Sequence, residues 1–312
     1  MTQPAEPIRE QRSVFYFSRR DELPKPYTDF YVQMFLDDIS RRMVPIRDRG
    51  REIELEGGDS RSEALIQHAV SWRDYSSSFD WGVSEFLRLA TSEICAFDEA
   101  IFEIAYLRNA QSRELEGFLF FHIDPRQLSW KWGKLFQIVP EEEARKRQVG
   151  TEIHLPLEDT LIFALPKKLR CQVARLRSAL TRLSEVRLAG HALQLSNTVP
   201  NYDFRDHERS LNLALAQACA EIGWDARGSY RDKTLGYLQM DSFLRFEQFQ
   251  IEVRKVVFDL FNQALDRVRL QLPLKGRVSP ASAPDSPFVQ KAREDLQAGR
   301  DSFVRIMDRF RG

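Results

Sequence analysis

One short stretch of the sequence combines residue types that can hold a metal ion. Glu152, His154, Glu158 and Asp159 lie within eight residues of one another, and because side chains alternate along a strand, Glu152 and His154 would share a face. Carboxylates and an imidazole around a divalent metal could activate water for hydrolysis. Charge that protects an exposed strand edge is the simpler interpretation. A metal-assisted hydrolase is therefore the weakest of three functional hypotheses.

Other enzyme signatures are weaker still. Asp98, Glu99 and Glu103 could supply a carboxylate pair for acid–base chemistry, but an acidic strand face is the preferred interpretation. The sequence contains no GxxxxGK[ST], GxGxxG, GxSxG or HExxH pattern, and these are the patterns that position phosphates, nucleophiles or zinc. We therefore expect a protein that is not an enzyme, with no catalytic residue, no metal site and no cofactor.

Two tryptophans flank a lysine near the middle of the chain. Trp130, Lys131 and Trp132 combine aromatic rings with a cation, as do proteins that stack and neutralise single-stranded nucleic acid. Tryptophans two residues apart on a strand share one face, which is more often core or interface. The preferred interpretation of this group is therefore core or an interface.

Charge is unevenly distributed along the chain, although 46 basic and 46 acidic residues cancel. From Arg51 to Glu103, four basic residues against twelve acidic ones leave a net charge of −8. From Lys167 to Arg187, seven basic residues against Glu185 alone leave +6. Each run is interpreted first as solvated helix surface. A helix with so little acid is also a candidate contact for a polyanion.

The composition limits the class of protein. A chain of 312 residues with 43 % hydrophobic and 29 % charged content is typical of a soluble globular protein with one large or two modest domains. No apolar stretch is long enough to cross a bilayer, and the polar first residues contain no hydrophobic signal core. Cys95, Cys171 and Cys219 are scattered and are interpreted as core residues in a reducing compartment. Zero net charge argues against a tight, nonspecific nucleic-acid binder.

Periodicity predicts an α+β protein that is mainly α-helical. Helices are expected over 27–43, from Ser60 onward, over 81–94, 167–188, 211–222 and 243–268, and around Phe303, Ile306, Met307 and Phe310. Strands are expected over 100–107, 118–123, 128–132, 134–139, 152–155 and 160–165. The connecting segments are a loose N-terminal arm, a polar stretch around Gly57, a charged insert over 141–150, an irregular loop over 191–204 and a linker over 273–287.

Three sequence segments, in the order in which they occur, resemble segments of the portal proteins of tailed bacteriophages. AFDEAIFEIAYL (96–107) is similar to the aromatic strand that enters the clip of those proteins, FHIDPRQLSW (121–130) to the Asp-Pro strand that follows, and LPLEDTLIFALP (155–166) to the strand before the second stem helix. The resemblance covers about residues 27–270. The chain departs from the family pattern at Phe97 and Asp98, where portals commonly carry glycine, and at Phe163, where they carry histidine.

The resemblance implies a portal-like layout and function. It assigns a helical wing to 1–80, a stem helix to 81–96, a β-rich clip to 97–166, a basic stem helix and channel loop to 167–204, a long-helix wing or crown to 205–272, and a linker and C-terminal helix to 273–312. It implies a ring of about a dozen copies that conducts double-stranded DNA and docks a terminase motor, the capsid and head–tail connector proteins. The expected location is the portal vertex of the virion, after assembly in the host cytoplasm, without membrane contact.

Two groups of candidate residues follow from this resemblance. The DNA-channel candidates are Lys167, Lys168, Arg170, Arg175, Arg177, Arg182, Arg187, His191 and Asn197. The oligomer-interface candidates are Trp130, Trp132, Phe243, Phe246, Phe249 and Phe261, of which the phenylalanines are interpreted first as core. DNA must slide through a channel, and each phosphate fixed by Lys or Arg adds salt-dependent affinity. A neutral subunit with segregated charge suits that need.

The second functional hypothesis is a non-enzymatic cellular interaction scaffold. It would use the phenylalanine-rich helix as a partner groove or as a coiled-coil face.

Overall fold

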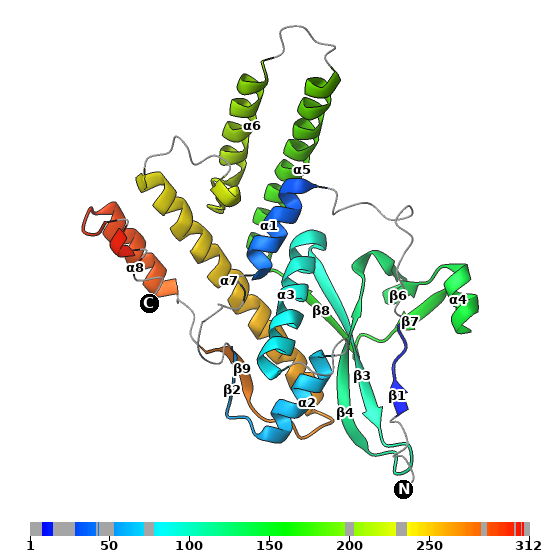
Figure 1. The fold of residues 1–312 in the computed structure, drawn as a ribbon. Coiled ribbons are helices and arrows are strands. Elements are labelled where there is room, and N and C mark those ends of the chain that lie inside the picture. The colour runs from blue at the N-terminus through cyan, green and yellow to red at the C-terminus, as the bar shows by residue number, and fades with distance from the viewer. Residues whose placement is uncertain are drawn as a thin grey trace. The chain divides into compact units, whose positions relative to one another are not determined.

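The structure, a computed structural model, describes residues 8–14, 29–41, 43, 53–71, 78–196, 203–228, 236–281, 286–302, 304–306 and 308. These residues form an α+β protein that is mainly helical, which confirms the predicted fold class (Figure 1). The chain divides into two compact units. Unit 1 comprises Met1–Pro24, Met43–Ala164 and Val256–Ser282, and unit 2 comprises Lys25–Arg42, Leu165–Lys255 and Ala283–Gly312.

Unit 1 is built around an antiparallel sheet whose central strand is β3 (Glu99–Arg108). β4 (Leu115–Ile123) pairs with one edge of β3, so the first two expected strands form a hairpin. On the other edge, β8 (Thr160–Ala164) pairs with the first half of β3, and β1 (Ile8–Glu10) pairs with its last residues. The expectation of a loose arm is wrong at β1, because three residues are too few to show strand alternation.

A second antiparallel sheet in unit 1 consists of β5 (Leu128–Lys131), β6 (Lys134–Ile138) and β7 (Glu152–Leu155). Leu135 and Leu155 lie in one apolar cluster with side chains of β3 and β4, so the two sheets share a core. Alternation placed Trp132 on a strand, but it lies in the two-residue turn between β5 and β6.

The charged insert between β6 and β7 contains helix α4 (Glu141–Arg147). Glu141 pairs with Arg145 at 2.9 Å and Glu143 with Arg147 at 3.3 Å, each four residues apart. Acidic residues at the start of a helix and basic residues at its end complement the helix dipole. Apolar periodicity does not predict this helix, because its stabilising pattern is one of charge.

A two-stranded sheet joins β2 (Ile53–Glu56) to β9 (Arg277–Pro280). These segments were expected to belong to a polar stretch and a linker, and that expectation is wrong. Asn262 fixes β9, since its side-chain amide accepts from the Val278 N–H and donates to the Val278 carbonyl, both at 2.8 Å. Pairing between segments so far apart in the chain leaves no local signature.

The helices of unit 1 are α2 (Ser60–Val70), α3 (Phe79–Phe97) and the C-terminal part of α7 (Gly236–Arg269). Asp59 caps α2, because its carboxylate accepts a hydrogen bond from the Ser62 N–H at 2.8 Å. Ser60, where this helix was expected to begin, is its first residue.

The core of unit 1 is aromatic. The Phe86 ring of α3 has centroid distances of 4.5 to 6.1 Å to the rings of Phe102, Phe120, Phe163 and Phe261. These residues come from a helix, three strands and α7, so one ring cluster joins the sheet to its helices.

Unit 2 is helical in its described part. Its helices are α1 (Phe30–Arg41), α5 (Lys167–Ser196), α6 (Phe204–Cys219), the N-terminal part of α7, and α8 (Ser286–Gln297). α5 and α6 lie side by side as a hairpin, and α1 packs against α5 (Figure 1). None of the described helices in the chain combines the length and apolar character needed to cross a membrane.

The boundaries of α5 and α6 differ from the expected ones. α5 runs past Gly190 to Ser196, since a glycine costs a helix interior only about 1 kcal/mol relative to alanine. His191 therefore lies in a helix instead of a channel loop, whereas Asn197 lies outside the described residues. α6 begins at Phe204 instead of near residue 211, because Asp203 caps it there.

Buried apolar residues hold unit 2 together. One stripe of α5 is buried, comprising Leu169, Val173, Leu176 and Leu180. Trp224 is also fully buried; its ring meets Phe35 of α1 edge-on, and its indole N–H donates to Asp38 at 3.0 Å.

α8 covers the N-terminal part of α7 and was not expected. Val289, Ala292 and Leu296 of α8 cluster with Met240 and Leu244 of α7. Ile306, from the predicted final helix, belongs to the same cluster. Its expected companions lie outside the described residues: Phe303, Met307 and Phe310.

Candidate nucleic-acid interface

The solvent-exposed surface of α5 carries five basic side chains. We call these residues, Lys167, Lys168, Arg170, Arg175 and Arg182, the basic face. Lys168, Arg175 and Arg182 follow one another at intervals of seven residues, or about 10.5 Å along one side of the helix. The buried stripe of α5 packs into unit 2, so these cations remain in solvent.

Two other predicted channel residues are half-buried, Arg177 and Arg187. The guanidinium of Arg187 lies 4.0 Å from the ring centroid of Phe30 and 5.5 Å from that of Tyr31. This cation–π contact joins α5 to α1. Arg187 is therefore better described as part of the joint between two helices than as a DNA contact.

The residues of the basic face differ in whether they make an ion pair with a carboxylate. Arg175 makes an ion pair with Glu221 at 2.6 Å. Within the described ranges, no carboxylate pairs with Lys168 or Arg182. The same holds for Lys167 and Arg170, so four cations of the basic face are available to a polyanion, and Lys168 and Arg182 are the two that share one side of the helix.

The first turn of α5 contains three cations and no acidic residue. Lys167, Lys168 and Arg170 all lie there. The amino end of a helix carries partial positive charge, so each cation there is unfavourable by up to about 1 kcal/mol. Residues that oppose local stability are expected mainly at functional sites. The basic face is therefore better interpreted as a contact for a polyanion than as an ordinary solvated helix surface.

A pocket of about 340 Å³ lies between α1, α5 and α6. Arg187, His207, Glu208 and Asn212 line it together with Tyr31. Burial raises the pKa of the Tyr31 hydroxyl, and the Arg187 cation opposes that effect. Because Arg187 already contacts Phe30 and Tyr31, and Glu208 adds negative charge, the pocket offers an anion little net attraction.

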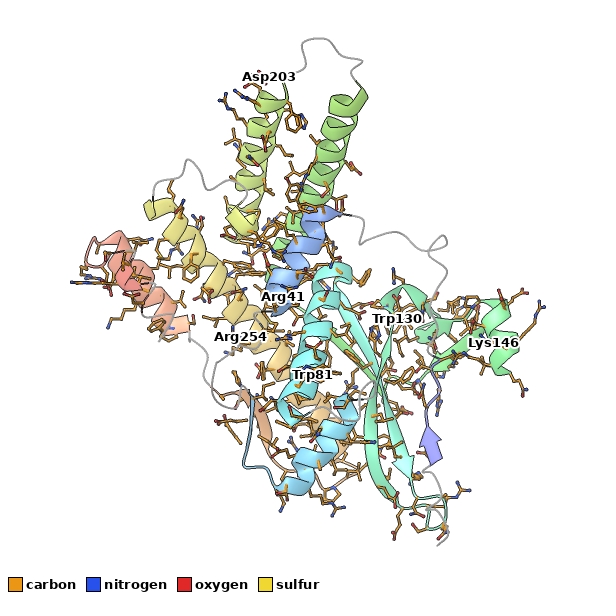
Figure 2. The ribbon with its side chains drawn as sticks, in the orientation of Figure 1. Arg41, Trp81, Trp130, Lys146, Asp203 and Arg254 are labelled. Atoms are coloured by element: carbon orange, nitrogen blue, oxygen red, sulfur yellow. The ribbon has the colours of Figure 1, made fainter. Side chains whose placement is uncertain are left out.

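The β5–β6 hairpin exposes two tryptophans. Trp130 is 54 % exposed and Trp132 is 89 % exposed, so neither is a core residue. Figure 2 labels Trp130 on this hairpin. Trp132 and Gly133 have φ angles of 50° and 71°, which is the left-handed pair of a type I′ turn. Asparagine or glycine normally occupies such positions, and a tryptophan there is strained. A large ring kept in solvent at this cost indicates a contact surface.

The phenylalanines of α7 offer less area to a neighbour than expected. Phe246, Phe249 and Phe261 are buried within the chain. Phe243 is half-buried against the cluster that contains Met240. These side chains serve the core of the chain, which was their first interpretation.

The candidate metal ligands of β7 do not converge. Glu152 makes an ion pair with Lys131, and the exposed His154 lies beside Phe136 with ring centroids 5.4 Å apart. Burial raises the pKa of Asp159, with further repulsion from Glu158. Over the part of the chain that the structure covers, no three His, Cys, Asp or Glu side chains could hold a metal together.

Glu103 was interpreted as part of an acidic strand face, but it is only 2 % exposed. Its carboxylate accepts hydrogen bonds from the backbone N–H groups of Arg12 and Ser13, both at 2.8 Å. The sequence did contain a signal, since a lone carboxylate in a strand apolar on both faces needs a partner if buried. Asp98 serves differently, as the left-handed cap that ends α3.

A second buried pair joins α3 to β4. Glu93 Oε2 and His122 Nε2 lie 2.7 Å apart. Burial raises the pKa of Glu93, and His122 opposes that effect. No local pattern could have revealed a pair formed between a helix and a strand.

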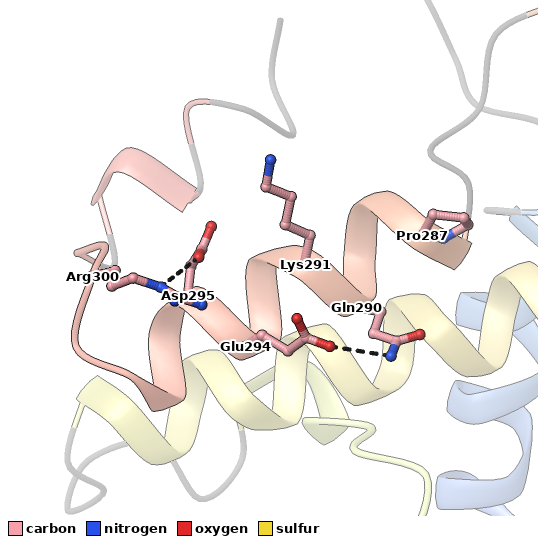
Figure 3. A pocket seen from close by; sticks show the side chains of 6 residues that line it. All are labelled: Pro287, Gln290, Lys291, Glu294, Asp295 and Arg300. Carbon is pink, nitrogen blue, oxygen red and sulfur yellow. Dashed lines mark hydrogen bonds and ion pairs between the residues drawn. The ribbon is translucent and has the colours of Figure 1, made fainter.

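A shallow depression of about 600 Å³ runs along α8 (Figure 3). Arg300 pairs with Asp295 at 3.0 Å, and the Gln290 amide donates to Glu294 at 3.2 Å. Small-molecule sites are usually enclosed and largely apolar. The depression has neither property and is not a candidate site.

No family model matches the chain, and no curated protein matches it. Function is therefore inferred from the surfaces of this chain.

Proposed function

We propose that the chain is a portal-like ring subunit that conducts double-stranded DNA at a capsid vertex and docks a packaging motor and a head–tail connector. It is not an enzyme in this proposal, and the ATPase of the motor is a separate chain. The basic face of α5 carries the proposal, because its cations stand in solvent on the helix that follows the β-rich segment. The order of helix, β-rich segment and basic helix supports it as well.

The charge balance supports a sliding contact. Affinity for DNA grows with the number of phosphates that fixed cations neutralise. The chain is neutral, and Arg175 shares its charge with Glu221. A few available cations in each copy would guide DNA along a channel without holding it.

The β5–β6 hairpin supports the docking part of the proposal. Trp130 and Trp132 present aromatic rings to solvent, and such rings are frequent anchors of protein interfaces. We assign them to contacts with a neighbouring copy, with the motor or with the connector.

Images of the purified full-length protein test the ring. Annuli with a central hole are expected, with a mass of many copies of the 36.5 kDa chain. A stable monomer at high concentration would contradict the ring and would favour a cellular interaction scaffold. A defined one-to-one complex with a cellular protein would point the same way.

Charge reversal tests the DNA contact. Lys168→Glu combined with Arg182→Glu should leave the annuli intact and reduce DNase-protected DNA in heads assembled with the variant. Arg145→Glu is the matched control, because Arg145 is equally a surface cation but lies on α4 and pairs with Glu141. Equal DNA protection by wild type and the double variant would place the DNA elsewhere.

A further inference from the structure

Residues 8–14, which we call the arm, fill the open half of one edge of β3. Ile8 lies opposite Arg108, and Glu10 lies opposite Tyr106 in antiparallel register. β8 occupies the remaining half of that edge, up to Glu103. The arm thus adds a strand where the sheet would otherwise expose unpaired backbone groups.

Two buried side chains, Glu103 and Gln137, hold the end of the arm, and we call them the clasp. The Glu103 carboxylate accepts from the N–H groups of Arg12 and Ser13, both at 2.8 Å, and from the Ser13 hydroxyl. The Gln137 amide accepts from the Val14 N–H at 2.8 Å and donates to the Val14 carbonyl at 2.7 Å. Because Glu103 lies on β3 and Gln137 on β6, the arm bridges the two sheets of unit 1.

Removal of the arm from the clasp would destabilise the protein. Glu103 and Gln137 are both almost fully buried, and a buried polar group without a partner loses the hydrogen bonds that water would have provided. Every copy of the protein therefore needs an arm in its clasp. The hydrogen bonds themselves do not require that the arm belong to the same copy.

The connection between the arm and the helices permits exchange. Fourteen residues, 15–28, separate Val14 from Asp29, just before α1. A segment of this length can span at most about 50 Å. The arm belongs to unit 1, whereas α1 belongs to unit 2.

The phenylalanines of α7 do not supply the apolar surface that was expected to close the proposed ring. Phe246, Phe249 and Phe261 are buried within the chain, so they cannot join copies as their sequence pattern suggested. An exchanged strand would join copies by backbone hydrogen bonds, by the buried polar contacts of the clasp and by the apolar contact of Val14 with Val139 and Ala144.

We propose that, in the ring, each clasp is filled by the arm of a neighbouring copy. This inference rests on the proposed function, since it requires a ring. The partner is a second copy of this chain, and the recognised segment is its residues 8–14. The exchanged arm is thus the strand that locks one subunit to the next.

Split cysteine variants of the full-length chain test the exchange. Glu10 and Arg108 make an exposed ion pair at 2.7 Å, so cysteines at these positions would lie within reach of a short bismaleimide. Glu10→Cys is placed on one tagged chain and Arg108→Cys on another, both with Cys171→Ser because Cys171 is exposed. The two chains are expressed together, and assembly and stability are checked before cross-linking.

Exchange predicts a cross-linked species of twice the mass of the 36.5 kDa chain. Glu56→Cys in place of Arg108→Cys is the control and should give none, because the exposed Glu56 lies on β2, which pairs with β9 in a separate sheet. A single chain that carries both Glu10→Cys and Arg108→Cys should give a ladder of multimers. Annuli with cross-linking only at the mass of one chain would overturn the exchange and leave the proposed function standing. Monomers without annuli would overturn both.

Discussion

Buried polar side chains are the residues that most constrain this molecule. Glu103, Gln137 and Asn262 are each nearly or fully buried, and each bonds to backbone groups of a segment distant in sequence. A buried polar group left without a partner costs about 1–3 kcal/mol. Each of these residues therefore fixes the position of one strand or arm.

Replacement of Glu103 should expose this dependence. Glu103→Ala removes the acceptor of two backbone N–H groups, so the free energy of unfolding in urea should fall by about 1–3 kcal/mol. Glu10→Ala is the control, because Glu10 pairs with Arg108 at the surface and such pairs contribute at most about 1 kcal/mol. Equal losses in the two variants would show that the clasp adds nothing beyond a surface ion pair.

Glu93 should give stability a particular pH dependence. Burial raises its pKa above the ordinary value of 4.5, against the opposing effect of His122. The folded protein then keeps the proton to higher pH than the unfolded chain does, so stability is lost as pH rises through that interval. The free energy of unfolding of wild type minus that of Glu93→Gln should fall as pH rises above 4.5.

Urea titrations across this pH range measure the difference. Glu85→Gln is the control, because Glu85 is a half-exposed partner of Arg88 on the same helix. A difference that rises with pH would mean that His122 holds the carboxylate ionised, which would contradict the direction expected from burial.

Two elements contain residues that oppose the stability of the element itself. The β5–β6 hairpin turns through Trp132 in a left-handed conformation. α5 begins with three cations and no acid in its first turn. In each element the unfavourable residue is exposed, so packing within the chain does not explain it, whereas the proposed contacts with DNA and with other subunits would.

Trp132→Asn should raise stability and weaken assembly. Asparagine tolerates the left-handed region, where other residues lose roughly 1–2 kcal/mol, and Trp132 is too exposed to lose much packing. The free energy of unfolding should therefore increase by about 1 kcal/mol, while ring formation or partner docking declines. Trp130→Asn, in a strand beside Leu135, should lose stability instead. A destabilised Trp132→Asn would mean that the ring packs within the chain.

Lys168→Glu should likewise stabilise the helix that it alters. A carboxylate in the first turn complements the helix dipole, which adds about 0.3–1 kcal/mol. Arg182→Glu lies in the middle of α5, where the dipole has little effect, and should change stability less. Circular dichroism during thermal unfolding compares the two variants. A loss of stability in Lys168→Glu would mean that Lys168 has a stabilising partner.

At the scale of the whole molecule, neutrality results from separated charges. The acidic run before Glu103 and the basic run of α5 cancel in the total. The part of the basic run that faces solvent is smaller than its sequence count, because Arg187 stacks on Phe30 and Arg175 pairs with Glu221. The neutral sum therefore conceals a small number of available cations in each copy.

The affinity of the proposed ring for DNA should depend on how few of these cations each subunit offers. If about two phosphates are neutralised at a time, the affinity for a linear duplex should fall about tenfold between about 50 and 200 mM salt. Fluorescence anisotropy with a labelled duplex measures it. The slope should be shallower for Lys168→Glu combined with Arg182→Glu. A thousandfold loss in wild type would indicate tight binding, which is incompatible with sliding.

The sequence by itself determined the elements whose stability is decided within a short stretch. The periods of their apolar residues were enough to predict α1, α3, α7 and the β3–β4 hairpin. The buried stripe of α5 follows from the same cause, since one face of a regular helix must pack. The mainly helical α+β class follows from these locally determined helices and strands.

Only the tertiary structure decided which residues meet across the chain. β1 pairs with β3 and β2 pairs with β9 because their backbone groups find partners in distant segments. Whether a side chain is buried, as Glu103 is, or exposed, as Trp132 is, also depends on segments that are distant in sequence. Burial and hydrogen bonding depend on neighbours in space, and residue type and spacing along the chain do not specify those neighbours.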